Sequence, residues 1–449
     1  MKKLWQKGSQ NSSKIVEDYC FSDGVVLDNN LVSHDVYGSI AHAHALQKLK
    51  IITNQELEKL TQCLREILAL NEKGEFTVIP SDEDVHTKVE NHLTEKLGEL
   101  GKKIHTGRSR NDQVLVDLRL YAKENLFNVA NKTINLIQTY VDFAKKYEFV
   151  PMPGYTHMQK AMPSSIGMWG GSFAESLLDD LKFLTSAYEL NDQSPLGSGA
   201  AYGLSLSIDR ALTSELLGFA KVQNNSLYSQ VSRPKVQLAV MQSLVQIMLT
   251  LSRFAQDLLL FTTSEFNFFA VASELCTGSS IMPQKKNLDI MEHLRAKTHV
   301  VIGYQQIVSS MSAGLISGYN ADFSETKGPF MKSFEIISKT LDVVDITVKS
   351  LEPNFEALEK AMTSELYATH AAYELVKKGM AFREAYIQIG KSLSNLPEYD
   401  SQEVLKLSNH LGGTGNLGLK SIEKNVIIAG QQWKKQSDFY QKTINNLIK

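Results

Sequence analysis

The sequence predicts an all-α protein made of three helical parts, in which a long central helix bundle lies between two sets of shorter helices. The 449 residues include only 10 prolines, less than half of the usual share of about 5%, and proline is the residue that most often interrupts a helix. Residues 112–150 and 235–277 contain neither glycine nor proline. The Val- and Ile-rich segments 300–308 and 336–348 repeat their apolar residues at helical spacing and not in the alternation of a strand.

The first part, residues 1–105, is expected to be an N-terminal helical domain. We predict helices over residues 33–48, 54–71 and 81–100. Thr53 comes directly before the second of these helices and is a good N-cap, because its hydroxyl can accept a hydrogen bond from a free amide of the first turn.

The second part, residues 106–353, is expected to be a bundle of long helices. Within residues 235–277 apolar residues recur at steps of three and four, and further apolar residues occupy the other faces of the same helix. A helix that is apolar nearly all round is buried on most sides, in a large bundle or at a subunit contact. Residues 354–449 return to shorter helices with glycine-bearing turns and form the predicted C-terminal helical domain.

The composition narrows the range of partners and locations. Lys and Arg total 47 against 49 Asp and Glu, a net charge of −2, so neither nucleic acid nor an anionic membrane surface is an expected partner. The longest apolar segment, residues 238–251, contains polar residues, and the N-terminus has no apolar leader, so we expect neither export nor a membrane span. Three scattered cysteines without a CxxC pair fit a reducing cytoplasm: Cys20, Cys63 and Cys276. The histidines lack an HExxH pattern or cysteine partners in the sequence, so we expect no bound metal and no cofactor.

Two breaks between the predicted long helices carry reactive side chains near the ends of residues 112–150. Residues 105–113, HTGRSRNDQ, combine two guanidiniums, a hydroxyl, an amide and a helix N-terminus, which can bind carboxylates or phosphates or can be a solvated capping segment. Residues 153–159, PGYTHMQ, place His157 beside Thr156 in a glycine turn. His157 can act as an acid or base near neutral pH, or it can be structural.

Two further breaks are rich in glycine. Residues 195–203, PLGSGAAYG, look like a dinucleotide-binding loop, but no strand precedes them and Tyr202 stands where that motif needs Gly or Ala, so a flexible turn is the better interpretation. Residues 277–287, TGSSIMPQKKN, contain paired serines and paired lysines after a glycine. This segment is either a mobile active-site loop, with a nucleophile or base and cations for an anionic substrate, or a plain exposed loop.

Taken together, these four segments resemble the motifs of one enzyme family. GSSIMPQKKN is similar to the GSSxMPxKxN signature of the fumarase/aspartase superfamily, and its Gln-Lys-Lys form resembles the argininosuccinate lyase family. HTGRSRNDQ, PGYTHMQ and PLGSGAAYG match further motifs of that family in order and spacing, and weaker similarity covers nearly the whole chain. The resemblance implies a fumarase/aspartase-like fold that assembles as a homotetramer around a multi-helix core. It also implies reversible cleavage of argininosuccinate to arginine and fumarate, the last step of arginine synthesis, in active sites shared between subunits.

The resemblance also implies roles for individual residues. Ser279 corresponds to the catalytic serine, Lys285 and Asn287 to the groups that hold the carboxylate on which charge accumulates, and His157 to the residue that protonates the departing nitrogen. Glu292 corresponds to the carboxylate that orients this histidine. Substrate contacts are implied for Asp28, Ser109, Arg110, Asn111, Thr156, Asn287, Tyr319, Ser324 and Lys327. The sequence departs from the family pattern at Gly24, Leu288, Ala321 and Ser324, which puts recognition of the arginine end in question.

Helix geometry alone also predicts shared sites. If residues 112–150 form one helix, the segment with Asn111 and the turn with His157 lie about 55 Å apart, and one subunit cannot bring both to one small substrate. The alternatives within the superfamily are fumarase, aspartase and adenylosuccinate lyase. A silent structural relative, as lens δ-crystallins are in this family, and a helical binding scaffold are the alternatives from other classes. Retention of Ser279, Lys285 and His157 favours an active enzyme.

Overall fold

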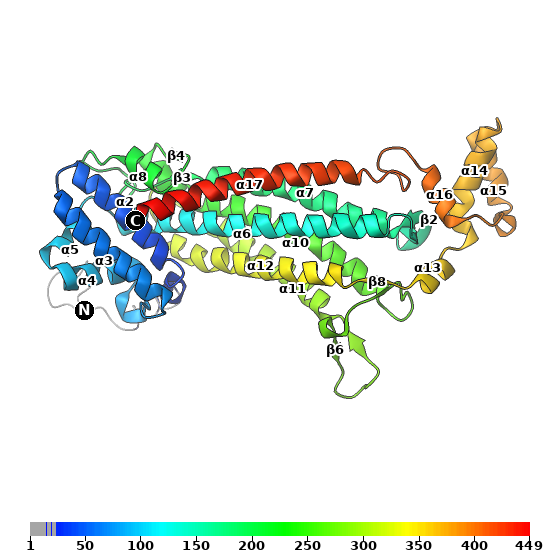
Figure 1. Cartoon of the computed structure of the whole chain (residues 1–449), viewed down its shortest axis with the longest axis horizontal. Coiled ribbons are helices and arrows are strands. Elements are labelled where there is room, and N and C mark those ends of the chain that lie inside the picture. Colours follow the sequence, from blue (N-terminus) through cyan, green and yellow to red (C-terminus); the bar gives the residue numbers. More distant parts are fainter. Residues whose placement is uncertain (1–14, 16–18, 20–23) are drawn as a thin grey trace.

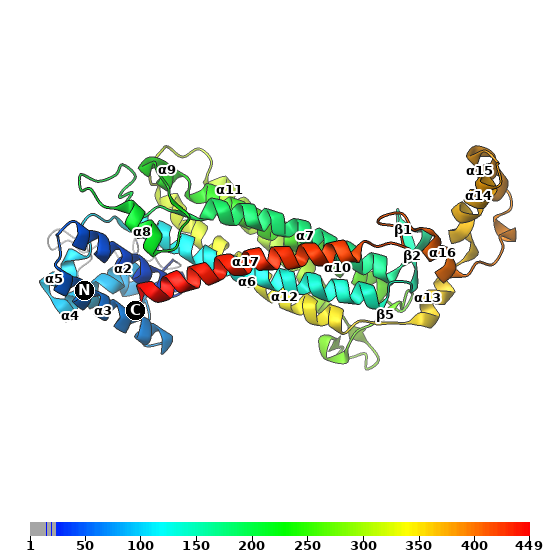
Figure 2. The ribbon, with the colours of Figure 1, turned by 45° about the horizontal axis from the view of Figure 1, so that its top comes forward.

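The computed structural model describes Ile15, Tyr19 and residues 24–449, so Cys20 lies outside the described residues. Six long helices form an elongated bundle (Figures 1 and 2): α6 (Arg110–Lys146), α7 (Ile166–Asn191), α10 (Arg233–Phe261), α11 (Asp289–Met311), α12 (Lys327–Lys349) and α17 (Leu419–Leu447). The all-α fold with a long central bundle is therefore confirmed.

Shorter helices lie at one end of the bundle, where the N-terminal part of the chain packs (Figure 1): α2 (Val32–Lys48), α3 (Asn54–Glu72), α4 (Val85–Leu97) and α5 (Glu99–Lys103). Thr53 caps α3 as predicted, because its Oγ1 accepts a hydrogen bond from Glu56 N while the Glu56 carboxylate accepts one from Thr53 N. The single helix predicted over residues 81–100 is wrong. Residues Pro80–Asp82 form a 3₁₀ turn, and Gly98, with φ of 59°, separates α4 from α5.

At the other end of the bundle are α13 (Phe355–Ala361), α14 (Ala368–Lys377), α15 (Phe382–Gly390) and α16 (Ser401–Leu407) (Figure 2). The chain then returns along the bundle as α17, which packs on α6 and α7. The boundaries at residues 105 and 353 stay a prediction, since α17 belongs to the C-terminal segment but packs on the central bundle. Two short helices, α8 (Arg210–Leu216) and α9 (Ser226–Val231), lie between α7 and α10 in the sequence.

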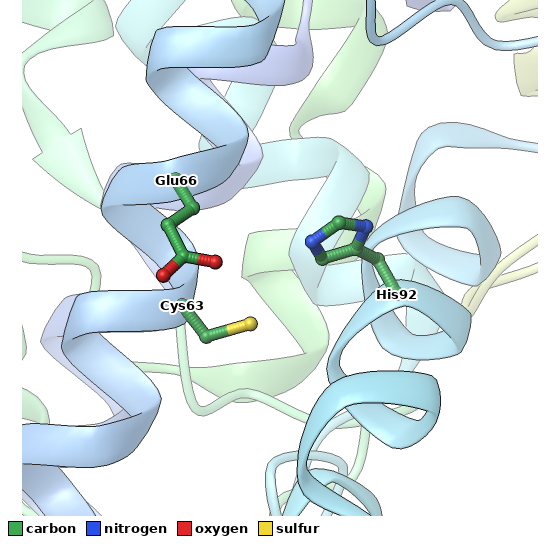
Figure 3. A group of neighbouring side chains, drawn as sticks. All are labelled: Cys63, Glu66 and His92. Atoms are coloured by element: carbon green, nitrogen blue, oxygen red, sulfur yellow. The ribbon is translucent and has the colours of Figure 1, made fainter.

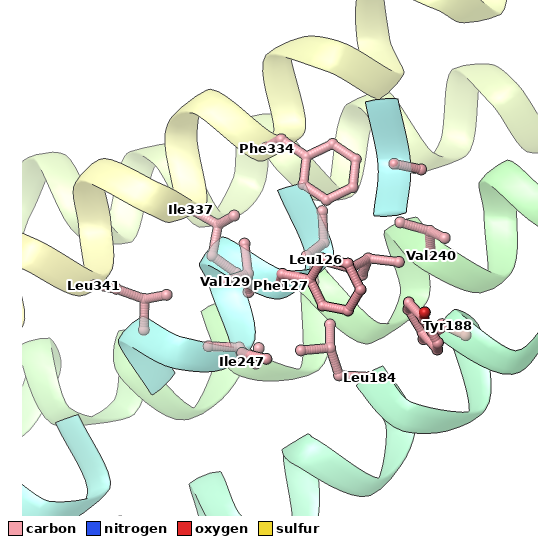
Figure 4. Packing of buried hydrophobic residues seen from close by; sticks show 14 of the residues in the cluster. Leu126, Phe127, Val129, Leu184, Tyr188, Val240, Ile247, Phe334, Ile337 and Leu341 are labelled. Carbon is pink, nitrogen blue, oxygen red and sulfur yellow. The ribbon is translucent and has the colours of Figure 1, made fainter. Parts of the chain in front are cut away.

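The centre of the bundle is a continuous apolar core around α6, which contacts α7, α12 and α17. Phe127 on α6 meets Tyr188 of α7 and Tyr440 of α17 at ring-centroid distances of 5.3 and 5.8 Å. Figure 4 shows α6 side chains among those of α7, α10 and α12, including Leu126, Val129, Leu184, Val240, Ile247, Phe334, Ile337 and Leu341. This packing makes the bundle a stiff frame that holds its two ends apart.

The helix predicted to run to residue 277 ends at Phe261. Thr262 and Thr263 turn their hydroxyls back onto the carbonyls of Leu258 and Leu260, and Asn267 adopts φ of 49°, so the chain leaves the helix there. The following residues form β5 (Phe269–Ala270), which pairs with β8 (Glu352–Pro353), and β6 (Thr277–Gly278), which pairs with β7 (Lys286–Asn287).

The break predicted at residues 153–159 is a β-hairpin. Strand β1 (Pro151–Thr156) pairs antiparallel with β2 (Gln159–Ser165) beyond the end of α6. The pairing was not expected because prolines stand within both strands and no Asn-Gly turn marks the reversal. A last short pair, β3 (Gln193–Ser194) with β4 (Lys221–Val222), is parallel.

Among the described residues α10 is the one helix whose length and apolar composition would allow it to cross a membrane. It packs against α7, α11 and α12 inside the bundle, as the core helix of a bundle does. Large apolar side chains nevertheless remain exposed along this side of the chain, among them Leu249 on α10 and Val300 and Ile307 on α11.

Candidate active site

A cavity of about 880 Å³ lies where the first turns of α6, α10 and α12 meet α4 and residues 24–28. Six of the predicted substrate-binding residues line it: Asp28, Arg110, Asn111, Tyr319, Ser324 and Lys327. Ser109 does not line the cavity but is the N-cap of α6, where its hydroxyl accepts a hydrogen bond from Asn111 N at 3.2 Å. The fold thus gathers residues that are up to about 300 positions apart in the sequence into one site.

The cavity carries charges of both signs, arranged in pairs. Lys327 Nζ binds Asp28 Oδ1, and the other oxygen of Asp28 accepts a hydrogen bond from Val85 N at 3.1 Å. Arg110 donates to Asp84 and, at 3.0 Å, to Glu83. Burial lowers the pKa of Arg110, but the carboxylates of Asp84 and Glu83 outweigh it and raise that pKa above its ordinary value. A substrate that carries both carboxylates and cationic groups can replace the partners in these pairs, with its carboxylates binding the cationic side chains and its cations binding the carboxylates.

Several charged residues of the cavity, besides Glu83 and Asp84, were missed by sequence reasoning. Arg233, buried in the first turn of α10, has its pKa lowered by burial. A charged residue at the start of a largely apolar helix was the available signal. His86 donates from Nδ1 to Asp35 at 2.7 Å. Burial lowers the pKa of His86, but the carboxylates around it, Asp35 above all, raise it to about 9, so this histidine is a buried cation at neutral pH.

The glycine loop of residues 195–203 is tied to the same end of α6. Gly197 N and Gly199 N donate to Asp112 Oδ2 at 3.0 and 2.9 Å, while Asp112 Oδ1 accepts a hydrogen bond from Ser109 N. Burial raises the pKa of Asp112 even though these amides and Arg108 oppose the shift. These buried hydrogen bonds hold Gly197 and Gly199 against the first turn of α6 and help to set the start of that helix. The flexibility of the rest of the segment stays a prediction.

Thr156 and His157 lie at the opposite end of α6, on the turn between β1 and β2. His157 and Met158 occupy the two central positions of this turn with φ of 52° and 62°. Two positive φ angles are the geometry of a type I′ turn, which residues other than Gly, Asn and Asp rarely adopt. The turn holds the imidazole of His157 out at the surface, and strain of this kind is often found at functional sites.

Ser279 and Lys285 lie on the loop between β6 and β7, which extends away from the bundle (Figure 1). Ser279 Oγ accepts hydrogen bonds from the amides of Ile281 and Met282 at 3.3 and 3.1 Å. Ile281 is 83% exposed, which is unusual for a large apolar side chain and indicates that nothing in the described part of the chain covers it. Asn287 ends the hairpin, and Glu292 follows in the first turn of α11, exposed.

One chain therefore presents the predicted residues at three separate places. Asn111 and its neighbours lie at one end of α6, His157 at the other, and Ser279 on the projecting loop. The 37 residues of α6 span about 55 Å, far more than the length of a small substrate. The structure keeps the catalytic and the binding residues apart within one chain, and the length of α6 had predicted this separation.

Sequence and structure comparisons identify the relatives of this chain. A family model described as "Lyase" matches residues 10–303. Argininosuccinate lyase of Thermotoga neapolitana is 41% identical over 87% of this chain and 98% of its own length, and that of Sorangium cellulosum is 38% identical over 94% and 98%. The chain belongs to the argininosuccinate lyase family. It is a lyase, and the resemblance drawn from its motifs is confirmed.

Solved structures agree on the fold. EDDS lyase in complex with formate superposes with a TM-score of 0.81 at 20% identity, covering 98% of this chain and 95% of that one. Class II fumarase from Schistosoma mansoni gives a TM-score of 0.72 at 17% identity, covering 85% and 92%. At these identities the structural likeness supports the fold alone. The substrate has to be inferred from the family match and from the residues of the site.

Proposed function

We propose that this chain, assembled as a homotetramer, catalyses the reversible β-elimination of argininosuccinate to L-arginine and fumarate, the last step of arginine synthesis. The observation that carries the proposal is the cavity with paired charges of both signs. Argininosuccinate has three carboxylates, an amino group and a guanidinium, so it needs cations and anions in one site. Malate, the substrate of a fumarase, has two carboxylates and a hydroxyl but no cationic group, so it would not make use of the carboxylates of Asp28, Glu83 and Asp84.

The elimination removes a weakly acidic proton next to a carboxylate and so builds negative charge on that carboxylate. In the proposed site Ser279 takes this proton, and Lys285 and Asn287 stabilise the charge with an ammonium and an amide. His157 protonates the departing guanidino nitrogen, and Glu292 orients His157.

The binding residues are proposed to divide between the two ends of the substrate. Ser109, Arg110, Asn111 and Thr156 hold the succinyl carboxylates, while Asp28, Tyr319, Ser324 and Lys327 hold the arginine end. Gly24 stands where many members have a serine, and a Cβ there would lie 3.7 Å from Lys327 Nζ. A serine hydroxyl would fit beside that ammonium, so its absence removes one polar group from the arginine end.

Assembly into a tetramer is proposed to complete each site from three subunits. It is supported by the separation of the three groups of residues and by the apolar side chains of Leu249, Val300 and Ile307, which other subunits would cover. We also propose a cytoplasmic location, on the scattered cysteines.

The reaction is tested by following fumarate absorbance with purified protein and argininosuccinate, in parallel with adenylosuccinate, malate and aspartate. Fumarate from argininosuccinate alone is the expected result. Equal or faster turnover of another of these substrates would refute the proposal.

The adjacent serines provide a matched test of the catalytic role. Ser279→Ala should abolish turnover and leave the assembly intact by size-exclusion chromatography. Ser280→Ala changes the same atoms one position away and should retain most of the activity. Full activity in Ser279→Ala would remove this serine from the mechanism.

A further inference from the structure

A second group of reactive side chains lies in the N-terminal helices, apart from the cavity and from the catalytic loop. Cys63 and Glu66 are one turn apart on α3, and His92 projects towards them from α4 (Figure 3). One ligand atom from each residue, the thiol sulfur, a carboxylate oxygen and an imidazole nitrogen, lies within 4.8 Å of the other two. None of the three residues has a part in the proposed reaction.

The hydrogen bonding of His92 leaves a nitrogen available. His92 Nε2 is buried and has no hydrogen-bond partner among the described residues. The ring itself is fixed from another side, since it packs edge-on against Phe76 with centroids 5.7 Å apart. A buried imidazole nitrogen without a partner is unfavourable, and a ligand that accepts its lone pair would remove that penalty.

We propose that Cys63, Glu66 and His92 form a zinc site that joins α3 to α4. Thiolate, imidazole and carboxylate are the three ligand types that Zn²⁺ takes in proteins, with bond lengths of roughly 2.0 to 2.3 Å. Such bonds place tetrahedral ligands about 3.5 Å apart. The observed atoms can reach that separation by small side-chain rotations, because all three sit on two neighbouring helices. Glu66 is exposed, which leaves the fourth position of the metal open to water.

The protonation states of Cys63 and His92 determine whether a proton must leave when the ion binds. Burial and the charge of Glu66 raise the pKa of Cys63 to about 11, against the effect of Lys96. Burial, with Lys96 and Lys88, lowers the pKa of His92, although Glu95 and Glu66 oppose this, so the imidazole is neutral and ready to ligate. Zinc binding therefore releases the thiol proton of Cys63 to solvent, and affinity should increase with pH.

Among the described residues a second cluster has metal-like spacing but a different charge arrangement. Asp35, His86 and Asp117 also lie within 4.8 Å of one another. His86, however, already forms an ion pair with Asp35 in which the carboxylates raise its pKa to about 9. A protonated imidazole cannot ligate a metal through that nitrogen, so we do not assign a metal ion to this cluster.

The site at Cys63 could not be predicted from the sequence because its ligands are split between α3 and α4 and match no zinc motif. Cys63→Ser and His92→Ala remove ligands, while Cys276→Ser and His44→Ala are matched controls that change the same residue types elsewhere. The purified full-length protein, stripped with a chelator, is titrated with Co²⁺ and then with Zn²⁺. Cobalt is the probe because a Co²⁺–thiolate bond has a characteristic charge-transfer absorption.

The expected result is a thiolate-to-cobalt band that saturates at one ion per chain and is bleached by Zn²⁺. Cys63→Ser should lose the band, His92→Ala should weaken cobalt binding roughly tenfold or more, and both controls should match the parent protein. Zinc should also raise the unfolding temperature of the parent protein and not that of Cys63→Ser. Absence of the band at millimolar cobalt, or a band that persists in Cys63→Ser, would overturn the proposal. Neither readout depends on catalysis, so failure here leaves the proposed reaction untouched.

Discussion

Mixing two inactive variants tests whether active sites are shared between subunits. Asn111→Ala removes a substrate contact at one end of α6, and His157→Ala removes the proposed acid at the other. The two positions are about 55 Å apart along α6. If each site takes Asn111 from one subunit and His157 from another, random mixing at equal amounts leaves both residues intact in about one quarter of the sites. Each variant alone should be nearly inactive, so about a quarter of the parental activity should return.

The assay is fumarate release after the two variants have been unfolded and refolded together, or exchanged to equilibrium, with exchange proven by separating differently tagged chains. A variant with both substitutions on one chain is the matched control. When it is mixed equally with unmodified chains, about one quarter of the activity should remain if sites are shared and about one half if each chain contains a whole site. No recovery in the first mixture after proven exchange, together with one half in the second, would refute the reasoning from the length of α6.

Three further predictions concern stability. Met158→Gly should raise the free energy of unfolding by about 1 kcal/mol, because glycine adopts φ of 62° without the clash of a Cβ. Urea unfolding measures this change. Met158→Ala is the control and should leave the free energy of unfolding without such an increase. Thr53→Ala should lower the free energy of unfolding by about 1 kcal/mol, because the hydrogen bond from Glu56 N to Thr53 Oγ1 is lost. Urea unfolding measures this change as well, and an unchanged free energy of unfolding would contradict the capping role. Burial lowers the pKa of His86, but nearby carboxylates, chiefly Asp35, raise it from 6.5 to about 9 in the folded state. The charged form of His86 therefore stabilises the fold fully below pH 6.5. That stability should be lost as the pH rises through about 9, and thermal melts of a His86→Gln variant should lack this part of the pH dependence.

Much of the fold could be predicted because its signals are local. The helix predicted at residues 33–48 is observed as Val32–Lys48, and the one at 54–71 as Asn54–Glu72. Apolar spacing and an N-cap residue determine such elements within a few turns of chain. The motifs that carry the family resemblance are also short and contiguous, so they could be recognised without any structure.

The failures have two physical causes: local hydrogen bonds that no sequence motif marks, and contacts that join distant segments. The hairpin after α6 depends on pairing between strands rich in proline, and the end of α10 depends on hydroxyls that turn back onto its last carbonyls. Arg233 and His86 reach the cavity only because the helix ends meet there. The approach of Cys63 to His92 likewise needs α3 packed on α4.

The sequence by itself therefore determined most of the helices, the cap at Thr53 and the chemical family, since each of these depends on neighbours along the chain. Only the tertiary structure decided which charges share the cavity, which carboxylates keep His86 protonated, and that α6 holds Asn111 and His157 apart. Electrostatic pairing and burial act through space between residues far apart in the sequence, and the packing of the bundle sets those distances.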